Sequence, residues 1–258
     1  MPSRRQVDLS AVPQDLHAIA DALDRLLGAS AETGERTHVV VRREAPVGRL
    51  GLALEPWAGL EGWIRAERLD ALLLHRPWRL PLDALPAELG VLASHAPFDE
   101  RLGLGWNPHL AEQLELEQVE PLGSRGGAAV GMTGRFGPAT WPVLLGRLTA
   151  VFGGLEECIG APPESEASMV GRLAVARAMT PDLVGEAARA GAQVFVTGEL
   201  RGPARGAVLA TRIAAVAIGH ARAERWSLGL LARLLAAEWP DLRLDLAPDG
   251  VIDRPRQA

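Results

Sequence analysis

The sequence predicts an α/β protein made of two lobes, each built on a mostly parallel sheet. Short apolar segments typical of buried strands alternate with amphipathic segments of helical period in both halves of the chain. A strand–helix–strand unit of this kind has parallel strands joined by a right-handed crossover. Three of the apolar segments run into a histidine. Because ligands of open α/β sheets bind at the carboxyl ends of strands, we expect a metal cleft there.

The length and composition of the chain narrow the range of partners. At 258 residues and 48% hydrophobic composition, the chain can bury the core of one large domain or of two smaller lobes. The formal net charge of −5 provides no basic field for nucleic acid or a membrane surface, and no apolar run has transmembrane length. A single cysteine excludes an intramolecular disulfide and is typical of a reducing compartment. We therefore expect a cytoplasmic protein whose partner is neither a membrane nor a nucleic acid.

Two residue types that carry chemistry in many enzymes, lysine and tyrosine, do not occur in the chain. Their absence excludes Schiff-base chemistry on lysine, a phosphate-loop lysine and a tyrosine general acid. Histidine, aspartate, glutamate, arginine, serine, threonine, the single cysteine and any bound cofactor remain as candidates. The cysteine, Cys158, has no obvious base beside it, so we expect it to be a small core residue.

The first lobe is expected to comprise residues 1–119. Apolar residues recur at helical spacing near the N-terminus, and the apolar segments that follow have the length of buried strands. Asn107 and Pro108 are typical of the N-cap and the first position of a helix. The predicted elements are helix 9–27, strand 47–54, helix 59–68, strand 69–74, strand 90–93 and helix 107–116.

A glycine-rich segment at residues 120–137 is expected to form a hinge or a hairpin between the lobes. A phosphate-binding loop is the alternative, but no Lys-Ser/Thr pair follows the segment and no strong dinucleotide fingerprint is present. A helix at residues 140–152 and a solvent-exposed loop at residues 161–168 complete the predicted connection, residues 120–168.

The second lobe, residues 169–258, is expected to repeat the alternation of strands and helices. Thr180 is a typical N-cap for a helix that begins at Pro181. The predicted elements are strand 172–176, helix 181–190, strand 193–197, helix 203–211, strand 214–218, helix 221–238 and strand 242–246.

Two histidine–carboxylate pairs near predicted strand ends are candidates for metal binding. His95 and Asp99 are four residues apart, and so are His220 and Glu224. On a helix this spacing places both side chains on one face, which we expect for the second pair. Pro97 predicts a loop for the first pair. Imidazole and carboxylate ligands suit Zn, Mn, Fe, Ni or Co.

A third histidine, His75, directly follows a predicted strand and joins the candidate site. Each pair taken alone is more often a surface or core contact than a metal site. The prediction of a metal site therefore depends on the occurrence of two such pairs together with His75. Glu199 ends another predicted strand and is expected either to line the same cleft or to begin a helix. His17, His38 and His109 lack such a context, and no role is assigned to them.

Several short motifs occur in order along most of the chain. They are residues 69–77, which end in Leu-His75-Arg76-Pro; residues 94–99 with 104–111; residues 134–137 (Gly-Arg-Phe-Gly); residues 194–199, which end in Thr-Gly-Glu; and residues 219–224 (Gly-His-x3-Glu). Each motif is weak by itself, but their order and spacing resemble those of the GTP cyclohydrolase 1 type 2 homologs. This family is also called the Nif-three-like dinuclear metal centre proteins.

The resemblance implies a set of metal ligands and an assembly. In the family, two adjacent histidines, a loop aspartate and the Gly-His-x3-Glu pair bind two divalent metals. Carried over to this chain, the ligands are His75, Asp99, His220 and Glu224, with one or two ions per chain. His95 matches a family histidine that lines the cleft. The family also implies a ring-like homohexamer of two-lobe chains.

The chain departs from the family pattern at three positions. Arg76 replaces the second of the adjacent histidines, and a guanidinium has no free lone pair with which to bind a metal. The residues after Glu199 lack the usual histidine, and residues 176–179 replace a glycine-rich turn. A single metal is compatible with these departures, and so is a degenerate site in which Arg76 supplies the charge of one cation. Arg76 could instead bind an anionic substrate or pair with Asp99.

The function implied by the resemblance is metal-dependent hydrolysis of a nucleotide or a related heterocycle. A bound metal lowers the pKa of water, and Glu224 or Asp99 is expected to orient or deprotonate that water, with His95 as a further catalytic candidate. Arg76 and Glu199 are expected to contact the small-molecule substrate. The alternative is a non-catalytic ring-forming protein that handles metal or binds a regulatory partner through a degenerate site.

Overall fold

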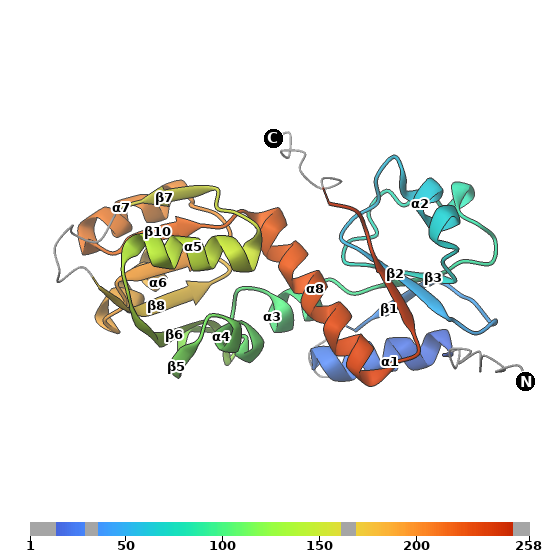
Figure 1. The fold of residues 1–258 in the computed structure, drawn as a ribbon, viewed down its shortest axis with the longest axis horizontal. Helices are drawn as coiled ribbons and strands as arrows, with labels where there is room; N and C mark the ends of the chain where they lie inside the picture. The colour runs from blue at the N-terminus through green and yellow to red at the C-terminus, as the bar shows by residue number, and fades with distance from the viewer. Residues whose placement is uncertain (1–13, 29–35, 161–168, 250–258) are drawn as a thin grey trace, which may run out of the picture. The chain divides into compact units, whose positions relative to one another are not determined.

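The computed structural model describes residues 14–28, 36–160 and 169–249. The chain divides into two compact units: unit 1 is Met1–Pro97 with Leu228–Ala258, and unit 2 is Phe98–Ser227. Each unit has its own sheet with helices (Figure 1), which confirms the predicted fold class of two α/β lobes. Unit 1 is discontinuous in sequence, whereas the expected lobes, residues 1–119 and 169–258, are continuous segments. Within the described ranges, no helix is both long and apolar enough to cross a membrane.

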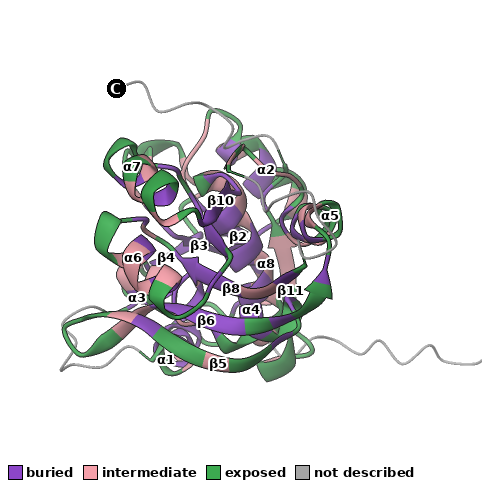
Figure 2. Cartoon of the chain, turned by 90° about the vertical axis from the view of Figure 1, so that its left-hand side faces the viewer, coloured by how far each residue is buried: buried purple, intermediate pink, exposed green. Residues whose placement is uncertain are grey.

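The sheet of unit 1 has the strand order β1-β4-β3-β2-β11. Its central strands β2 (Arg49–Ala53), β3 (Ala71–Leu74) and β4 (Gly90–Ala93) run parallel. Every residue of β3 and β4 is buried, as expected for strands covered on both faces, and Figure 2 shows them in the buried colour. The edge strands are the antiparallel β1 (His38–Val41) and the parallel β11 (Arg243–Leu246).

Two helices pack on this sheet. α2 (Leu60–Glu67) contributes Trp63 and Ile64 to a core cluster that also contains Leu72 and Leu74 of β3. α1 (Leu16–Leu27) begins after Asp15, whose side chain accepts hydrogen bonds from the backbone amides of the first turn. This cap explains why α1 starts later than the predicted helix 9–27; residues 9–13 of that prediction lie outside the described residues.

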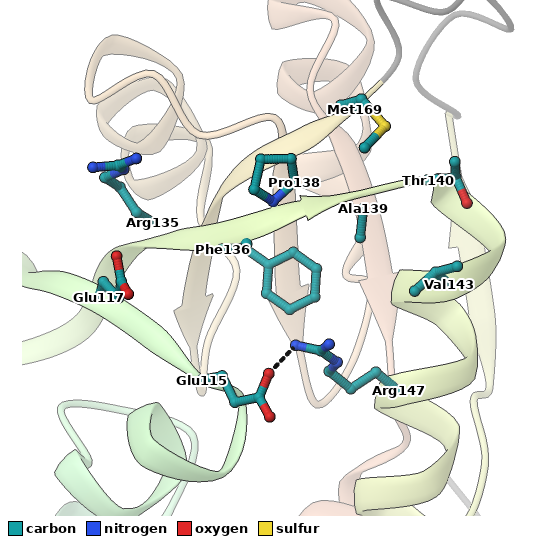
Figure 3. Close-up of a pocket in the computed structure, with 11 residues that line it drawn as sticks. Glu115, Glu117, Arg135, Phe136, Pro138, Ala139, Thr140, Val143, Arg147 and Met169 are labelled. Carbon is teal, nitrogen blue, oxygen red and sulfur yellow. Dashed lines mark hydrogen bonds and ion pairs between the residues drawn. The ribbon is translucent and has the colours of Figure 1, made fainter.

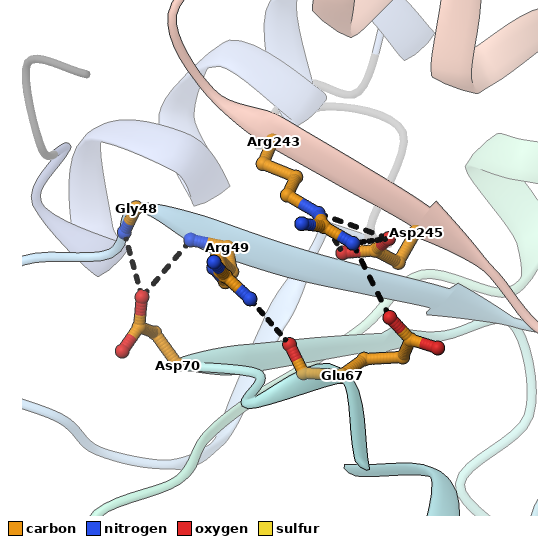
Figure 4. A network of polar contacts seen from close by, with 6 residues as sticks. All are labelled: Gly48, Arg49, Glu67, Asp70, Arg243 and Asp245. Atoms are coloured by element: carbon orange, nitrogen blue, oxygen red, sulfur yellow. Dashed lines mark hydrogen bonds and ion pairs between the residues drawn. The ribbon is translucent and has the colours of Figure 1, made fainter. Parts of the chain in front are cut away.

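Hydrogen bonds and ion pairs connect β2 to Asp70 and β11 to Glu67 (Figure 4). The Asp70 carboxylate accepts hydrogen bonds from the backbone amides of Gly48 and Arg49, each 2.9 Å long. Arg243 of β11 pairs with Asp245 at 3.1 Å and with Glu67 of α2 at 3.3 Å. The predicted strand 242–246 is thus confirmed, and it is held in the first sheet of the chain.

The sheet of unit 2 has the strand order β5-β6-β8-β9-β10-β7. Its centre is parallel, formed by β8 (Val170–Ala176), β9 (Val194–Thr197) and β10 (Ala214–Ala217). Phe195 of β9 is fully buried in a cluster with residues of α6 (Pro181–Arg189) and α7 (Gly202–Thr211). Unit 2 also contains α4 (Pro108–Gln113), α5 (Trp141–Phe152) and β7 (Glu157–Ile159). Helix α8 (His220–Glu238) begins in unit 2, and its residues from Leu228 on belong to unit 1, which also contains the short 3-10 helix Leu82–Ala84.

The glycine-rich segment is a hairpin inside the second sheet. β5 (Leu116–Arg125) and β6 (Ala128–Ala139) are antiparallel and joined by Gly126 and Gly127. Both glycines have positive φ angles, 59° and 83°, which a tight two-residue hairpin turn requires. The prediction of a hairpin is therefore confirmed, but the hairpin belongs to the second sheet and does not connect two lobes. The loop expected at residues 161–168 lies outside the described residues.

Candidate metal centre

The first part of the candidate site lies at the carboxyl ends of β3 and β4. In their parallel register Leu74 is opposite Ala93, so His75 and Ser94 are the next residues along the two strands. The Ser94 amide donates a hydrogen bond to the Leu74 carbonyl, which extends the sheet beyond the strand ends. His75 is 1% exposed, whereas His95 is exposed to solvent. The centroids of their imidazole rings are 4.9 Å apart.

Asp99 joins these histidines from helix α3 (Ala96–Leu102). The prediction of a loop here was wrong, because Pro97 lies in the first turn of α3, where a missing N–H removes no helical hydrogen bond. α3 starts shortly after β4, so the local chain determines where Asp99 lies. One potential ligand atom from each of His75, His95 and Asp99 lies within 4.8 Å of the others.

These three side chains suit a divalent metal ion. Imidazole nitrogens and carboxylate oxygens bind such ions at about 2.0–2.2 Å, so the atoms around one ion are separated by at most about 4.4 Å. Small side-chain rotations would bring the three atoms from their present separation of up to 4.8 Å into that range. The exposed imidazole of His95 also keeps one side of the cluster open to water or substrate. The cluster could therefore bind a metal ion.

The arginine that replaces the second histidine has a carboxylate partner within unit 1. Nη1 of Arg76 is 2.7 Å from Oε1 of Glu55, and the Arg76 side chain is only 4% exposed. Its guanidinium also lies 5.5 Å from the ring centroid of Trp78, close enough for a cation–π contact. Burial of a charged group is costly unless it is paired, so the ion pair with Glu55 accounts for the presence of Arg76 in this position.

The second histidine–carboxylate pair lies in unit 2, at the start of α8. Nε2 of His220 is 2.8 Å from Oε1 of Glu224, as the four-residue spacing on a helix predicts. The Glu224 side chain is 8% exposed and that of His220 is 49% exposed. An imidazole nitrogen and a carboxylate oxygen can each bind a divalent metal, so the pair has the chemistry of two metal ligands.

Gly219 positions this pair, because it forms the turn between β10 and α8. Its amide donates a hydrogen bond to the Gly198 carbonyl (3.0 Å), and its φ angle is +95°. A β-carbon there would lie 3.0 Å from Nη1 of Arg222 and 3.2 Å from Oε2 of Glu156. Both the backbone conformation and the lack of space therefore favour glycine.

We expect Gly219→Ala to lower the free energy of unfolding by about 1–3 kcal/mol, the cost of a strained backbone conformation. Urea unfolding followed by far-UV circular dichroism measures this change. Gly229→Ala is the control, because Gly229 lies inside the same helix with open space around its β-carbon position. Alanine should be neutral or stabilising there, by up to about 1 kcal/mol. Equal losses in the two variants would contradict a special role for Gly219.

A residue to which the sequence prediction gave no role, Arg177, also belongs to the site. It follows β8, and its Nη1 lies 3.0 Å from Oδ2 of Asp99. The hydroxyl of Thr197, at the end of β9, donates a hydrogen bond to the Arg177 carbonyl (3.3 Å). The only sequence signal was that residues 176–179 depart from the family's glycine-rich turn.

The other residues considered in the sequence analysis lie outside these clusters and have exposed side chains. The Glu199 side chain is 60% exposed and pairs with Arg201 at 3.5 Å. His17, His38 and His109 are exposed.

The prediction of Cys158 as a core residue was wrong, because the cysteine lies on the edge strand β7 and is exposed. Partial desolvation and the adjacent carboxylate of Glu157 raise the pKa of its thiol, which makes it less nucleophilic.

A separate pocket of about 670 Å³ in unit 2 is lined by residues of β5, β6 and α5 together with Glu115, Thr140 and Met169 (Figure 3). Nη1 of Arg147 pairs with Oε2 of Glu115 at 2.7 Å, and its guanidinium lies 4.8 Å from the ring centroid of Phe136. Glu117 and Arg135 add one charge of each sign. No predicted site residue lines this pocket, so it is separate from the candidate metal ligands.

The fold and the His75–His95–Asp99 cluster define a two-lobe α/β protein with a possible metal site. The chain belongs to the Duf34/NIF3 (NGG1p interacting factor 3) family, whose model matches residues 76–248. This match confirms the family that the sequence motifs indicated.

Solved structures share the fold over nearly the whole chain. The protein ybgI, described as of unknown function, is 21% identical with a TM-score of 0.72, covering 95% of this chain and 100% of that one. Reduced HcgD from Methanocaldococcus jannaschii is 18% identical with a TM-score of 0.68, covering 92% and 98% of the two chains. TTHA1606 from Thermus thermophilus is 19% identical with a TM-score of 0.68, covering 92% and 100%. Similarity at these identities shows the fold alone. No curated protein matches the chain.

Proposed function

We propose that this chain is a divalent-metal-dependent hydrolase that acts on a nucleotide or a related heterocycle. The proposal rests on one observation, that ligand atoms of His75, His95 and Asp99 converge to within 4.8 Å at the carboxyl ends of two strands. Clusters of imidazole and carboxylate groups in such positions are typical of catalytic metal sites. The resemblance to the dinuclear metal centre proteins supports the same assignment.

The proposed ligands are His75, Asp99, His220 and Glu224, with one or two ions of Zn, Mn, Fe, Ni or Co per chain. His75 is contributed by unit 1, whereas His220 and Glu224 are contributed by unit 2. The chemistry of the side chains supports this ligand set, because each group can present a neutral nitrogen or a carboxylate oxygen.

The proposed mechanism assigns a task to each side chain around the ion. When bound, the ion would polarise the scissile group and lower the pKa of water. The Glu224 carboxylate would accept the proton from water, and its contact with His220 holds it in one orientation. The exposed imidazole of His95 would contact the substrate, together with Arg76 and Glu199.

A non-catalytic protein that forms a ring and handles metal or binds a regulatory partner is the second candidate. The buried Arg76–Glu55 pair favours it, since Arg76 replaces a family metal ligand and has a stabilising contact of its own. We propose a homohexamer in the cytoplasm for both candidates.

We expect Glu224→Gln to bind metal more weakly, because Glu224 is a proposed ligand, and, when loaded with metal, to hydrolyse substrate about a hundredfold more slowly, the typical contribution of a general base. Metal is measured by elemental analysis of protein purified without a chelator or a histidine tag. Hydrolysis is measured by chromatography of reactions with GTP and a panel of other nucleotides. Glu238→Gln, the same change on the exposed carboxylate at the other end of α8, is the control and should leave both quantities unchanged.

The outcomes distinguish the two candidates. Metal in the wild-type protein, with hydrolysis that Glu224→Gln abolishes, supports the enzyme. A folded wild-type protein that takes up no Mn, Zn or Fe on reconstitution would refute the metal-dependent hydrolase and favour the partner-binding protein.

A further inference from the structure

We infer that Arg177 competes with the divalent metal for the carboxylate of Asp99 and thereby weakens and limits metal binding at this site. The inference rests on the proposed function, because it concerns the metal affinity of the same site. It starts from the 3.0 Å contact between Nη1 of Arg177 and Oδ2 of Asp99. That oxygen belongs to one of the three side chains that could ligate an ion.

The position of Arg177 is determined by its strand and not by its side chain alone. The residue follows β8 at the edge of the sheet where the parallel strands β9 and β10 also end. Its carbonyl accepts a hydrogen bond from the fully buried hydroxyl side chain of Thr197. Gly198 lies between this carbonyl and the start of α8, since a β-carbon there would be 3.9 Å from the Arg177 oxygen and 3.8 Å from the His220 Cα. The backbone of Arg177 is therefore anchored in unit 2, on the same sheet edge as His220.

The contact has a direct electrostatic consequence for a cation. The Asp99 side chain is 16% exposed, so water screens it only partly, whereas Arg177 is 45% exposed and can swing away. A divalent ion on Asp99 would lie within a few ångströms of the guanidinium, whose permanent charge cannot be removed by deprotonation. The ion must displace Arg177 or bind beside a positive charge, and either course lowers its affinity.

The charge of Arg177 bears on two positions at which this chain differs from the family pattern, Arg76 and residues 176–179. Arg76 removes one ligand of a two-metal centre, and its own charge is paired with Glu55. Arg177 places a cation on the Asp99 carboxylate, where the family pattern has a glycine-rich turn. The guanidinium of Arg177 thus already compensates part of the charge of Asp99, which reduces the attraction of that carboxylate for an ion.

Isothermal titration of the full-length, metal-stripped protein with MnCl2 tests this inference. We expect Arg177→Gln and Arg177→Met to bind Mn about five- to tenfold more tightly than the wild type, the effect of removing a partly exposed charge pair. Arg177→Lys, which keeps the charge, should bind about as weakly as the wild type. The matched control is Arg172→Gln, which removes an arginine of β8 that pairs with Glu120 at 3.1 Å. It should leave the affinity unchanged.

Unchanged or weaker Mn binding in folded Arg177→Gln and Arg177→Met, with binding retained by the wild type, would overturn the inference and leave the proposed metal site standing. Tighter binding in the lysine variant as well would also overturn it, because the charge would then not be the cause. Absence of Mn binding in every variant would reject the inference together with the proposed metal-dependent function.

Discussion

His75→Ala is expected to reduce metal affinity by several hundredfold and to abolish any metal-dependent hydrolysis. A four-ligand zinc site contributes roughly 10–16 kcal/mol, so one ligand accounts for about a quarter of that value. His75 is buried at the end of β3, so its imidazole is held in position by the surrounding core. Titration of the metal-stripped variant with Mn or Zn measures the loss.

His109→Ala is the matched control for this prediction, because His109 is exposed in the first turn of α4. It should bind metal like the wild type. Far-UV circular dichroism should show that both variants are folded. Wild-type affinity in a folded His75→Ala protein would exclude His75 as a ligand and refute the proposed site.

Phe195→Ala is expected to lower the free energy of unfolding by about 3–5 kcal/mol, the usual cost of removing a large buried aromatic side chain. Phe195 is fully buried on β9, between β8 and β10, and belongs to the core cluster beneath α6 and α7.

Urea unfolding followed by far-UV circular dichroism measures the effect. The control is Leu209→Ala on α7, where the side chain is 70% exposed, and its effect should stay within about 0.5 kcal/mol. A loss below about 1 kcal/mol in Phe195→Ala would show that the second sheet does not depend on this residue.

The sequence predicted helices and strands well where the residues that carry the signal are the residues that form the element. β4 has the predicted bounds, and Asn107 and Thr180 cap their helices through hydrogen bonds to backbone amides in the first turn, as their side-chain chemistry predicts. Apolar runs identified β3 and β4 because a strand covered on both faces has no polar face.

The errors arose where a residue is compatible with two local structures. Pro97 breaks a helix in its interior but fits the first turn, and the sequence does not show at which residue α3 begins. Cys158 is apolar enough for a core but lies on an edge strand, and its exposure depends on the order of strands in the sheet.

The candidate site was predictable in its residue types and spacing, but not in its contacts. The spacing of His220 and Glu224 is sufficient to predict their contact, because one helix carries both. The Arg177–Asp99 pair joins residues on α3 and after β8, and no periodicity relates positions so far apart in sequence. Partners of this kind depend on tertiary packing, which motif spacing does not describe.

The pairing of β11 with β2 has a consequence for the order in which the protein is made. Unit 2, Phe98–Ser227, is a continuous segment and leaves the ribosome complete, whereas unit 1 requires residues on both sides of it. Domains fold as units during synthesis, so unit 2 can acquire its structure while the sheet of unit 1 still lacks β11. During that interval the backbone of β2 presents an unpaired edge, the kind of surface that recruits other chains. The C-terminal strand therefore closes the first sheet as a last step of synthesis, and truncations that remove it should favour aggregation.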